Sequence, residues 1–150
     1  MGDAGGIEPS EEAVARASES VRSRIVRGMF GPGVFPEESF DVICLFQVLD
    51  HLPDPAAVLD VCLSLLRPGG LVLSVHHDVG ALPARLLGER SPIVDVEHTY
   101  LFSRETTRRL FESRAFAVER VAPVWNRVSL RHVLHLAPVP AAWKRFLGRL

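Results

Sequence analysis

The stretch that decides the fold runs from Phe40 to Val75 and reads FDVICLFQVLDHLPDPAAVLDVCLSLLRPGGLVLSV. Its two ends, Phe40–Phe46 and Leu71–Val75, are nearly continuous apolar runs, typical of parallel strands that are covered on both faces. Between them a helix is predicted from Asp54 or Pro55 to Leu66, because apolar residues recur there at helical spacing, and the Pro-Gly-Gly that follows ends it. This pattern predicts two adjacent parallel strands joined by a right-handed crossover. The apolar stripe of the helix consists of Val58, Leu59, Cys62, Leu65 and Leu66.

The segments on either side continue the alternation of strands and helices. Before the central stretch, the sequence predicts a short strand ending at Gly6–Ile7, a helix over Glu11–Ser20 capped by Ser10, and a strand over Arg24–Met29. After it, the sequence predicts a helix capped by Ser103 with Thr106 as its third residue, a strand over Phe116–Val124, a helix over Leu130–Leu136 and a basic amphipathic segment over Ala141–Leu150. Alternating elements of this kind predict an α/β layered fold.

The composition is that of a globular chain. It has 150 residues, enough for one domain, of which 47% are apolar and 23% charged. The longest apolar runs are of strand length, so no integral membrane segment is expected, and the acidic N-terminus is unlike a signal peptide. Cys44 and Cys62 lie in apolar segments without CxxC spacing. We therefore expect reduced, buried thiols and a cytoplasmic location.

Charge is distributed unevenly along the chain. Residues 1–103 carry a net charge of −8 and residues 104–150 a net charge of +7. Such asymmetry is found in surfaces that bind nucleic acids or membranes, and also in ordinary solvated helix faces. The basic residues are spread over three predicted elements with apolar residues between them, and no nucleic-acid-binding motif is present. No nucleic-acid partner is therefore expected.

Three motifs in order carry a family resemblance. They are FPEESFDVI at 35–43, VLDHLPDP at 48–55 and LLRPGGL at 65–71. Together they resemble class I S-adenosylmethionine-dependent methyltransferases of the small-molecule type 11 or type 23, with Asp50 in place of the usual Glu and Arg67 in place of the usual Lys. The resemblance covers roughly residues 6–136. It implies a Rossmann-like parallel sheet with flanking helices, S-adenosylmethionine as cofactor and a small-molecule methyl acceptor.

The resemblance also implies where the cofactor would bind. Glu8 looks like the acidic residue at the end of the family's second strand, which accepts hydrogen bonds from the ribose hydroxyls; a solvated Glu before a helix is the alternative. The loop after Phe40–Phe46 lies where α/β folds bind ligands, although packing explains Phe46 and Val48 equally well. His51 either stabilises this loop or approaches the substrate. The predicted cofactor-binding residues are Glu8, Met29, Phe30, Phe46, Gln47, Val48 and His51.

Candidate general bases follow the predicted strand Leu71–Val75 and lie in the next loop. Histidine suits proton removal because it titrates near neutrality, and we predict catalytic roles for His76, His77 and His98, with Asp78 and Tyr100 as neighbouring candidates. Structural or solvent-facing roles are the alternative. No metal site is predicted at His76–Asp78, because adjacent residues of a strand point to opposite faces.

One family motif is not found in the sequence. The family's first strand is followed by a Gly-x-Gly-x-Gly loop, whose backbone approaches the cofactor, and no such sequence occurs in the 150 residues. We therefore expect a partial methyltransferase domain over 1–150, without the first family strand and the last, whose sheet a partner or a missing segment would complete. S-adenosylmethionine binding by this chain alone is then expected to be weak. An inactive remnant or an interaction module is the alternative function.

Overall fold

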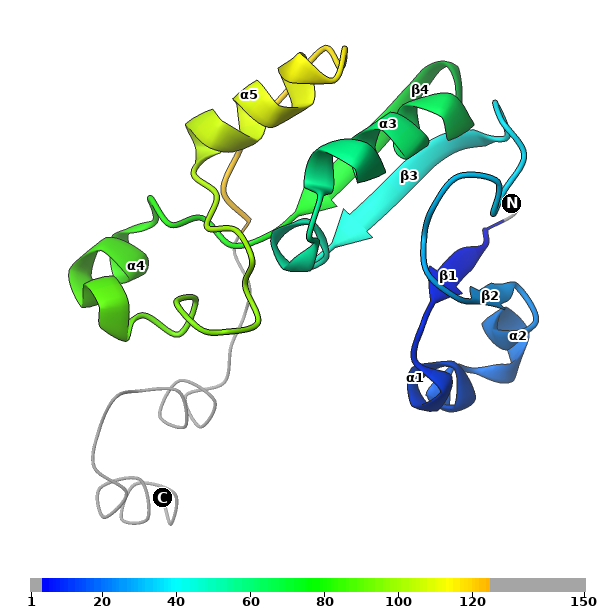
Figure 1. Ribbon diagram of the computed structural model, residues 1–150, viewed down its shortest axis with the longest axis horizontal. Helices are drawn as coiled ribbons and strands as arrows, with labels where there is room; N and C mark the ends of the chain where they lie inside the picture. Colours follow the sequence, from blue (N-terminus) through cyan, green and yellow to red (C-terminus); the bar gives the residue numbers. More distant parts are fainter. Residues whose placement is uncertain (1–3, 125–150) are drawn as a thin grey trace. The chain divides into compact units, whose positions relative to one another are not determined.

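The computed structural model describes residues 4–124. These residues form short helices and strands of three to ten residues (Figure 1). The described residues belong to two compact units. The first comprises the chain up to Ile43 together with Ala57–Leu71, and the second comprises Cys44–Ala56 and the chain from Val72 onward. Both strands of the central stretch run from one unit into the other.

The first unit begins with a small parallel sheet. Strand β1 (Gly6–Glu8) pairs in parallel with β2 (Ile25–Arg27), with Glu8 opposite Arg27. Two short helices, α1 (Glu11–Arg16) and α2 (Glu19–Arg22), connect the strands. The Ser10 hydroxyl accepts a hydrogen bond from the Ala13 N–H at 3.2 Å, which confirms the predicted cap.

The prediction of one helix over Glu11–Ser20 was wrong. Ala17 and Ser18 have extended backbone angles, with ψ of 144° and 146°, and these break the chain into two helices. Ser18 is the N-cap of the second helix, which agrees with the preference of serine for helix N-termini over helix interiors.

The central stretch forms strand β3 (Phe40–Phe46), helix α3 (Pro55–Leu65) and strand β4 (Leu66–Val75), as Figure 1 shows. β3 and β4 pair with each other. Ser39 donates to the Leu65 carbonyl at the start of the pair, and Gln47 donates to the Val75 carbonyl at its end. The two strands therefore run in the same direction, and the predicted parallel strand–helix–strand unit is confirmed.

β4 begins five residues earlier than predicted. The chain passes from Leu65, the last residue of α3, into the extended segment that contains the Pro-Gly-Gly sequence. Arg67 donates to both carboxylate oxygens of Asp41 at 2.9 Å, which ties this segment to β3. At Gly70 a Cβ atom would lie 3.2 Å from the Asp41 carbonyl oxygen, so the absence of a side chain permits the close approach of the two backbones.

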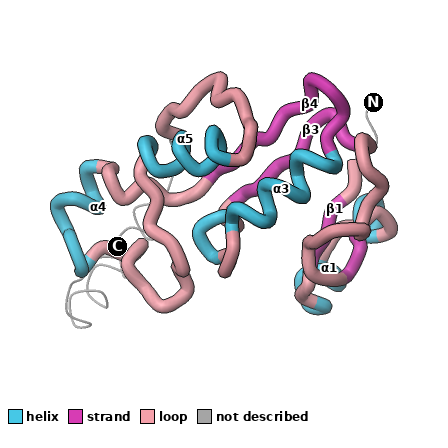
Figure 2. Tube along the Cα trace, turned by 45° about the horizontal axis from the view of Figure 1, so that its top comes forward, coloured by secondary structure: helices cyan, strands magenta, loops and turns pink. Residues whose placement is uncertain are grey.

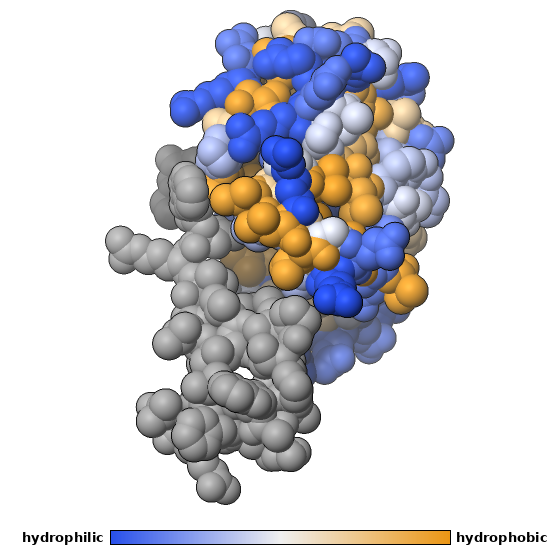
Figure 3. All heavy atoms as spheres, turned by 90° about the vertical axis from the view of Figure 1, so that its left-hand side faces the viewer, coloured by the Kyte–Doolittle hydropathy of each residue, from blue (hydrophilic) through white to orange (hydrophobic). Residues whose placement is uncertain are grey.

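One face of the paired strands is buried and the other is exposed. Leu59, Cys62 and Leu65 of α3 are buried together with Leu45 and Leu66, and α3 lies along the strands in both views of the chain (Figures 1 and 2). The alternate positions of the strands carry exposed apolar side chains. On the face of the molecule drawn in Figure 3, apolar residues lie among hydrophilic ones at the surface. The exposed positions are Val42, Cys44, Phe46, Leu71 and Leu73.

The second unit adds the 3₁₀ turns η1 (Leu49–His51) and η2 (Gly88–Arg90) and the helices α4 (Leu82–Leu87) and α5 (Arg104–Ser113). Ser103 and Thr106 form a capping box at the start of α5, as the sequence predicts. The predicted strand over Phe116–Val124 is not formed. Its backbone groups bond to α5 instead: the Phe116 N–H donates to the Phe111 carbonyl, and the Val118 carbonyl accepts from Arg108.

The elements predicted over Leu130–Leu136 and Ala141–Leu150 lie outside the described residues. Among residues 4–124, no helix combines the length and the apolar character needed to span a bilayer.

Candidate functional site

A buried carboxylate lies just beyond the end of β3. The chain turns at Gln47, whose φ of 53° is uncommon for a residue other than glycine, and the Gln47 N–H donates to the Val75 carbonyl at 2.7 Å. The turn is followed by η1, in which Asp50 is only 1% exposed beside the fully buried Leu49. An anion in such a place is costly unless charged or hydrogen-bonding groups face it.

Histidines surround the Asp50 carboxylate. Nε2 of His98 lies 3.7 Å from Oδ2, and Nε2 of His51 lies 3.9 Å from Oδ1. The His77 N–H donates a long hydrogen bond to Oδ2 at 3.4 Å. The Tyr100 N–H donates to the Asp50 carbonyl at 3.1 Å, which holds the segment before α5 against the loop after β3.

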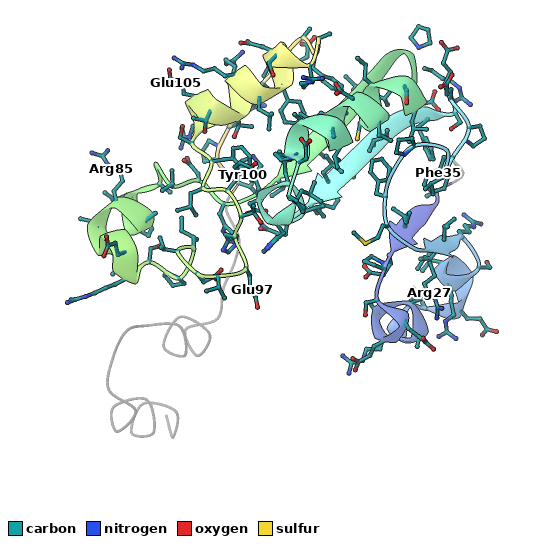
Figure 4. All side chains as sticks on the ribbon, in the orientation of Figure 1. Arg27, Phe35, Arg85, Glu97, Tyr100 and Glu105 are labelled. Carbon is teal, nitrogen blue, oxygen red and sulfur yellow. The ribbon has the colours of Figure 1, made fainter. Side chains whose placement is uncertain are left out.

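The Nδ1 atoms of His51 and His98 each have a hydrogen-bond partner other than Asp50. The His51 Nδ1–H donates to the Glu97 carbonyl, and the His98 Nδ1–H donates to the Asp95 carboxylate, both at 2.9 Å. Figure 4 shows that Glu97 and Tyr100 lie on the segment between α4 and α5. In the neutral form of each ring, which carries one proton, these bonds leave the Nε2 atom as an acceptor that faces the carboxylate.

The Asp95 carboxylate accepts hydrogen bonds from the backbone that directly follows it. Desolvation raises its pKa, but hydrogen bonds from the backbone N–H groups of Glu97 and His98, together with the His98 ring, outweigh it and bring the pKa below its ordinary value. The carboxylate form that the His98 ring requires is therefore favoured.

The predicted catalytic histidines separate into two places within the second unit. His77 and His98 lie in contact, with ring centroids 5.0 Å apart, and His51 lies against His98 at 4.6 Å. His76 has different neighbours. Its Nε2 lies 3.2 Å from the Thr107 hydroxyl, and its ring packs edge-on against Phe102. Burial lowers the pKa of His77, an effect that the Asp50 charge opposes.

Two other candidates make local contacts. The Asp78 carboxylate accepts from Arg104 at 3.0 Å and from the Gly80 N–H at 2.8 Å. The Tyr100 hydroxyl donates to the Pro53 carbonyl at 3.2 Å, and its ring stacks on Phe102.

The predicted cofactor-binding residues are distributed over both units. Phe46, Gln47 and Val48 form the exposed turn at the carboxyl end of β3 in the second unit. In the first unit, Glu8 ends β1, and its Oε1 accepts from the Ser10 N–H at 2.8 Å. Met29, which is 73% exposed, and Phe30 follow β2.

Asp50 and Asp95, which contact the cluster formed by His51, His77 and His98, were not predicted as site residues. Asp50 stands at a motif position where the family has Glu, and its burial beside three histidines was not expected. Asp95 precedes His98 by three residues, a spacing that brings short side chains together in a turn. The signal in the sequence was an acidic residue next to an apolar one, Leu49-Asp50, three residues after the predicted strand Phe40–Phe46.

Comparison with known proteins identifies the family. The family model Methyltransf_23, described as a methyltransferase domain, matches residues 3–121. The chain belongs to this methyltransferase family. The match spans β1 to α5 and therefore includes both sheets and the loop that carries Asp50.

Curated methyltransferases match shorter parts of the domain. A ubiquinone biosynthesis O-methyltransferase of Xylella fastidiosa is 39% identical over 51 residues, which are 33% of this chain and 21% of that protein. An uncharacterized methyltransferase of Schizosaccharomyces pombe is 33% identical over 90 residues, which are 52% of this chain and 32% of that protein. The matches thus span from about a fifth to about a third of these relatives.

Two solved structures share the fold. A SAM-dependent methyltransferase of Thermotoga maritima superposes with a TM-score of 0.62 and 23% identity, covering 75% of this chain and 55% of that one. The YcgJ protein of Bacillus subtilis superposes with a TM-score of 0.60 and 22% identity, covering 75% and 51%. The predicted α/β fold with parallel strands and flanking helices is thereby confirmed.

Proposed function

We propose that this methyltransferase domain binds S-adenosylmethionine and transfers its methyl group to a small-molecule acceptor. The family match over residues 3–121 carries the proposal. It is supported by parallel strands whose carboxyl ends bear Glu8 and the turn at Phe46–Val48, because α/β folds bind ligands at the carboxyl ends of their strands.

The position and contacts of Glu8 support this proposal. The Glu8 carboxylate ends β1 and uses one oxygen for the Ser10 N–H, and a carboxylate has further lone pairs to accept from two ribose hydroxyls. When bound, S-adenosylmethionine would supply an activated methyl group for in-line displacement. The chain would hold the ribose at Glu8 and orient the acceptor. His76, His77 and His98 remain the proposed acceptors for the proton that the substrate releases.

We expect these 150 residues alone to bind the cofactor weakly. A hydrogen bond to a charged group contributes about 1.5–3 kcal/mol, whereas micromolar affinity requires roughly 8 kcal/mol. The glycine-rich motif that supplies many of the family's contacts does not occur in the sequence. Met29 and Phe30 also stand where the family commonly has small or acidic residues, which weakens the expected adenine contact.

Titration of the purified chain with S-adenosylhomocysteine, followed by calorimetry and ligand-observed NMR, tests both points. We expect binding that is weaker than micromolar and that is lost in Glu8→Ala. Glu12→Ala is the matched control, since Glu12 is an exposed residue of α1 that pairs with Arg16. Equal binding by wild type and Glu8→Ala would contradict the role of Glu8.

Two further outcomes of this titration would contradict the proposal or the expected weak binding. Low-micromolar affinity that depends on Glu8 would contradict the expected weakness. A folded chain that shows no binding at millimolar ligand would overturn the proposal and favour an interaction module that uses no cofactor.

A further inference from the structure

Three hydrogen-bond acceptors face one another around Asp50 within the second unit. They are a carboxylate oxygen of Asp50 and one ring nitrogen each from His51 and His98, and all three lie within 4.8 Å of one another. The Nε2 atoms are the ring nitrogens that face the carboxylate. Each ring donates a hydrogen bond from its Nδ1–H to a group other than Asp50. His51 donates to the Glu97 carbonyl, and His98 donates to the Asp95 carboxylate. Lone pairs therefore converge on the buried Asp50 carboxylate, an arrangement that a bound cation relieves.

Two of these atoms lack any hydrogen-bond partner among the described residues. They are Asp50 Oδ1 and His98 Nε2, both fully buried. Buried polar atoms are nearly always hydrogen-bonded, so each exception needs a physical explanation. A proton shared between Asp50 and His98 would draw their atoms to hydrogen-bond distance, near 2.8 Å, but they lie 3.7 Å apart.

The contacts behind the rings are those of a metal site. Histidines that bind metal ions usually donate their other N–H to a carboxylate or a backbone carbonyl, which fixes the ring and raises the basicity of the ligating nitrogen. The cluster has one contact of each kind, Asp95 for His98 and the Glu97 carbonyl for His51. Asp50 is in turn supported by the His77 N–H.

We propose that Asp50, His51 and His98 bind a divalent transition-metal ion. Two imidazoles and one carboxylate suit Zn²⁺, Mn²⁺, Fe²⁺ or Co²⁺ better than Mg²⁺ or Ca²⁺, which prefer oxygen ligands throughout. Bond lengths of about 2.0–2.2 Å place ligand atoms roughly 3–3.6 Å apart, so binding draws this cluster inward. His51 supplies that movement, since its side chain is more than a third exposed while Asp50 and His98 are buried. Three protein ligands leave at least one coordination position for an exogenous molecule. With a metal bound, the Nε2 atom of His98 no longer accepts a proton, and the proposed role of proton acceptor then falls to His76 and His77.

The proposed metal site does not include His76, His77 or Asp78, where the sequence predicts no metal site. His76 bonds to Thr107 and packs on Phe102, away from Asp50. It therefore provides a matched control: a half-buried histidine one residue from the cluster that contributes no ligand atom.

Cobalt binding by the untagged 150-residue chain tests the proposal. After chelator treatment and dialysis, Co²⁺ is added and its visible d–d absorption is recorded, with calorimetry giving stoichiometry and affinity. We expect one ion per chain and displacement of Co²⁺ by Zn²⁺. Asp50→Asn, His98→Gln and His51→Gln should each weaken binding more than about 100-fold, and Asp95→Asn about 10–100-fold through its effect on His98. His76→Gln should bind as wild type does.

Circular dichroism of each variant separates loss of a ligand from loss of the fold. His51→Gln is decisive here because the His51 side chain is partly exposed and its replacement leaves no buried cavity. Absence of Co²⁺ absorption in the folded wild-type chain would overturn the proposal. Equal affinity in wild type and His51→Gln, with loss only in a His132→Gln/His135→Gln double variant, would also overturn it. These readouts are independent of cofactor binding, so this proposal and the proposed function can fail separately.

Discussion

The two cysteines of the chain differ in their surroundings. Cys62 is completely buried on α3, and desolvation raises the pKa of its thiol to about 12, against a smaller opposing contribution from a backbone hydrogen bond. Cys44 is exposed on β3. Because the thiolate is the reactive form, raising the pH to 9 leaves Cys62 as a protonated, unreactive thiol.

We therefore predict that the native chain reacts with one equivalent of an aromatic disulfide reagent at pH 8–9, and with two after denaturation. Cys44→Ser should remove the fast-reacting thiol and leave the slow one. Modification of Cys62 in the native chain at a rate similar to that of Cys44 would contradict the burial of α3.

Among the elements, β4 depends on a glycine. A Cβ atom at Gly70 would lie 3.0 Å from the Arg67 carbonyl oxygen and 3.0 Å from Cδ2 of Leu66. We predict that Gly70→Ala lowers the free energy of unfolding by about 1–3 kcal/mol, the usual cost of overpacking, as measured by urea denaturation. Gly6→Ala in β1 is the control, since a Cβ there meets nothing within 4 Å. A Gly70→Ala variant as stable as wild type would show that the strands can separate without cost.

Elements with a strong local pattern could be predicted from the sequence, and those decided by tertiary contacts could not. Phe40–Phe46 is a nearly continuous apolar run, and the observed strand has the same bounds. Phe116–Val124 alternates as a strand does, yet a strand also needs a partner strand. Two of its backbone groups, the Phe116 N–H and the Val118 carbonyl, bond to α5 instead. The cluster around Asp50 escaped prediction for a similar reason, because its ligand atoms come from residues 48 positions apart.

At the scale of the whole chain, both units share β3 and β4. The division falls between Ile43 and Cys44 in β3 and between Leu71 and Val72 in β4. Covalent continuity of both strands predicts that the units unfold together, in one cooperative transition.

Leu59→Ala tests this cooperativity. Leu59 is fully buried in the first unit, and its truncation should lower the free energy of unfolding by about 2–5 kcal/mol. We predict that hydrogen exchange then accelerates equally in α3 and in α5, although α5 belongs to the second unit. Leu63→Ala, at a 42% exposed position of the same helix, should change little. Acceleration confined to α3 would show that the units open separately.

The distance along the chain between Asp50 and its partner His98 also sets an order of events during synthesis. Ribosomes add about 5–20 residues per second, so the 48 residues that separate the two emerge over roughly 2–10 seconds. During that interval β3 and its loop are already outside the ribosome, and the carboxylate is still in contact with water. The burial of Asp50 is therefore a late step, completed only when the segment from Asp95 to Tyr100 closes over it. A nascent chain arrested after Val75 but before Asp95 has emerged would have both paired strands without the site.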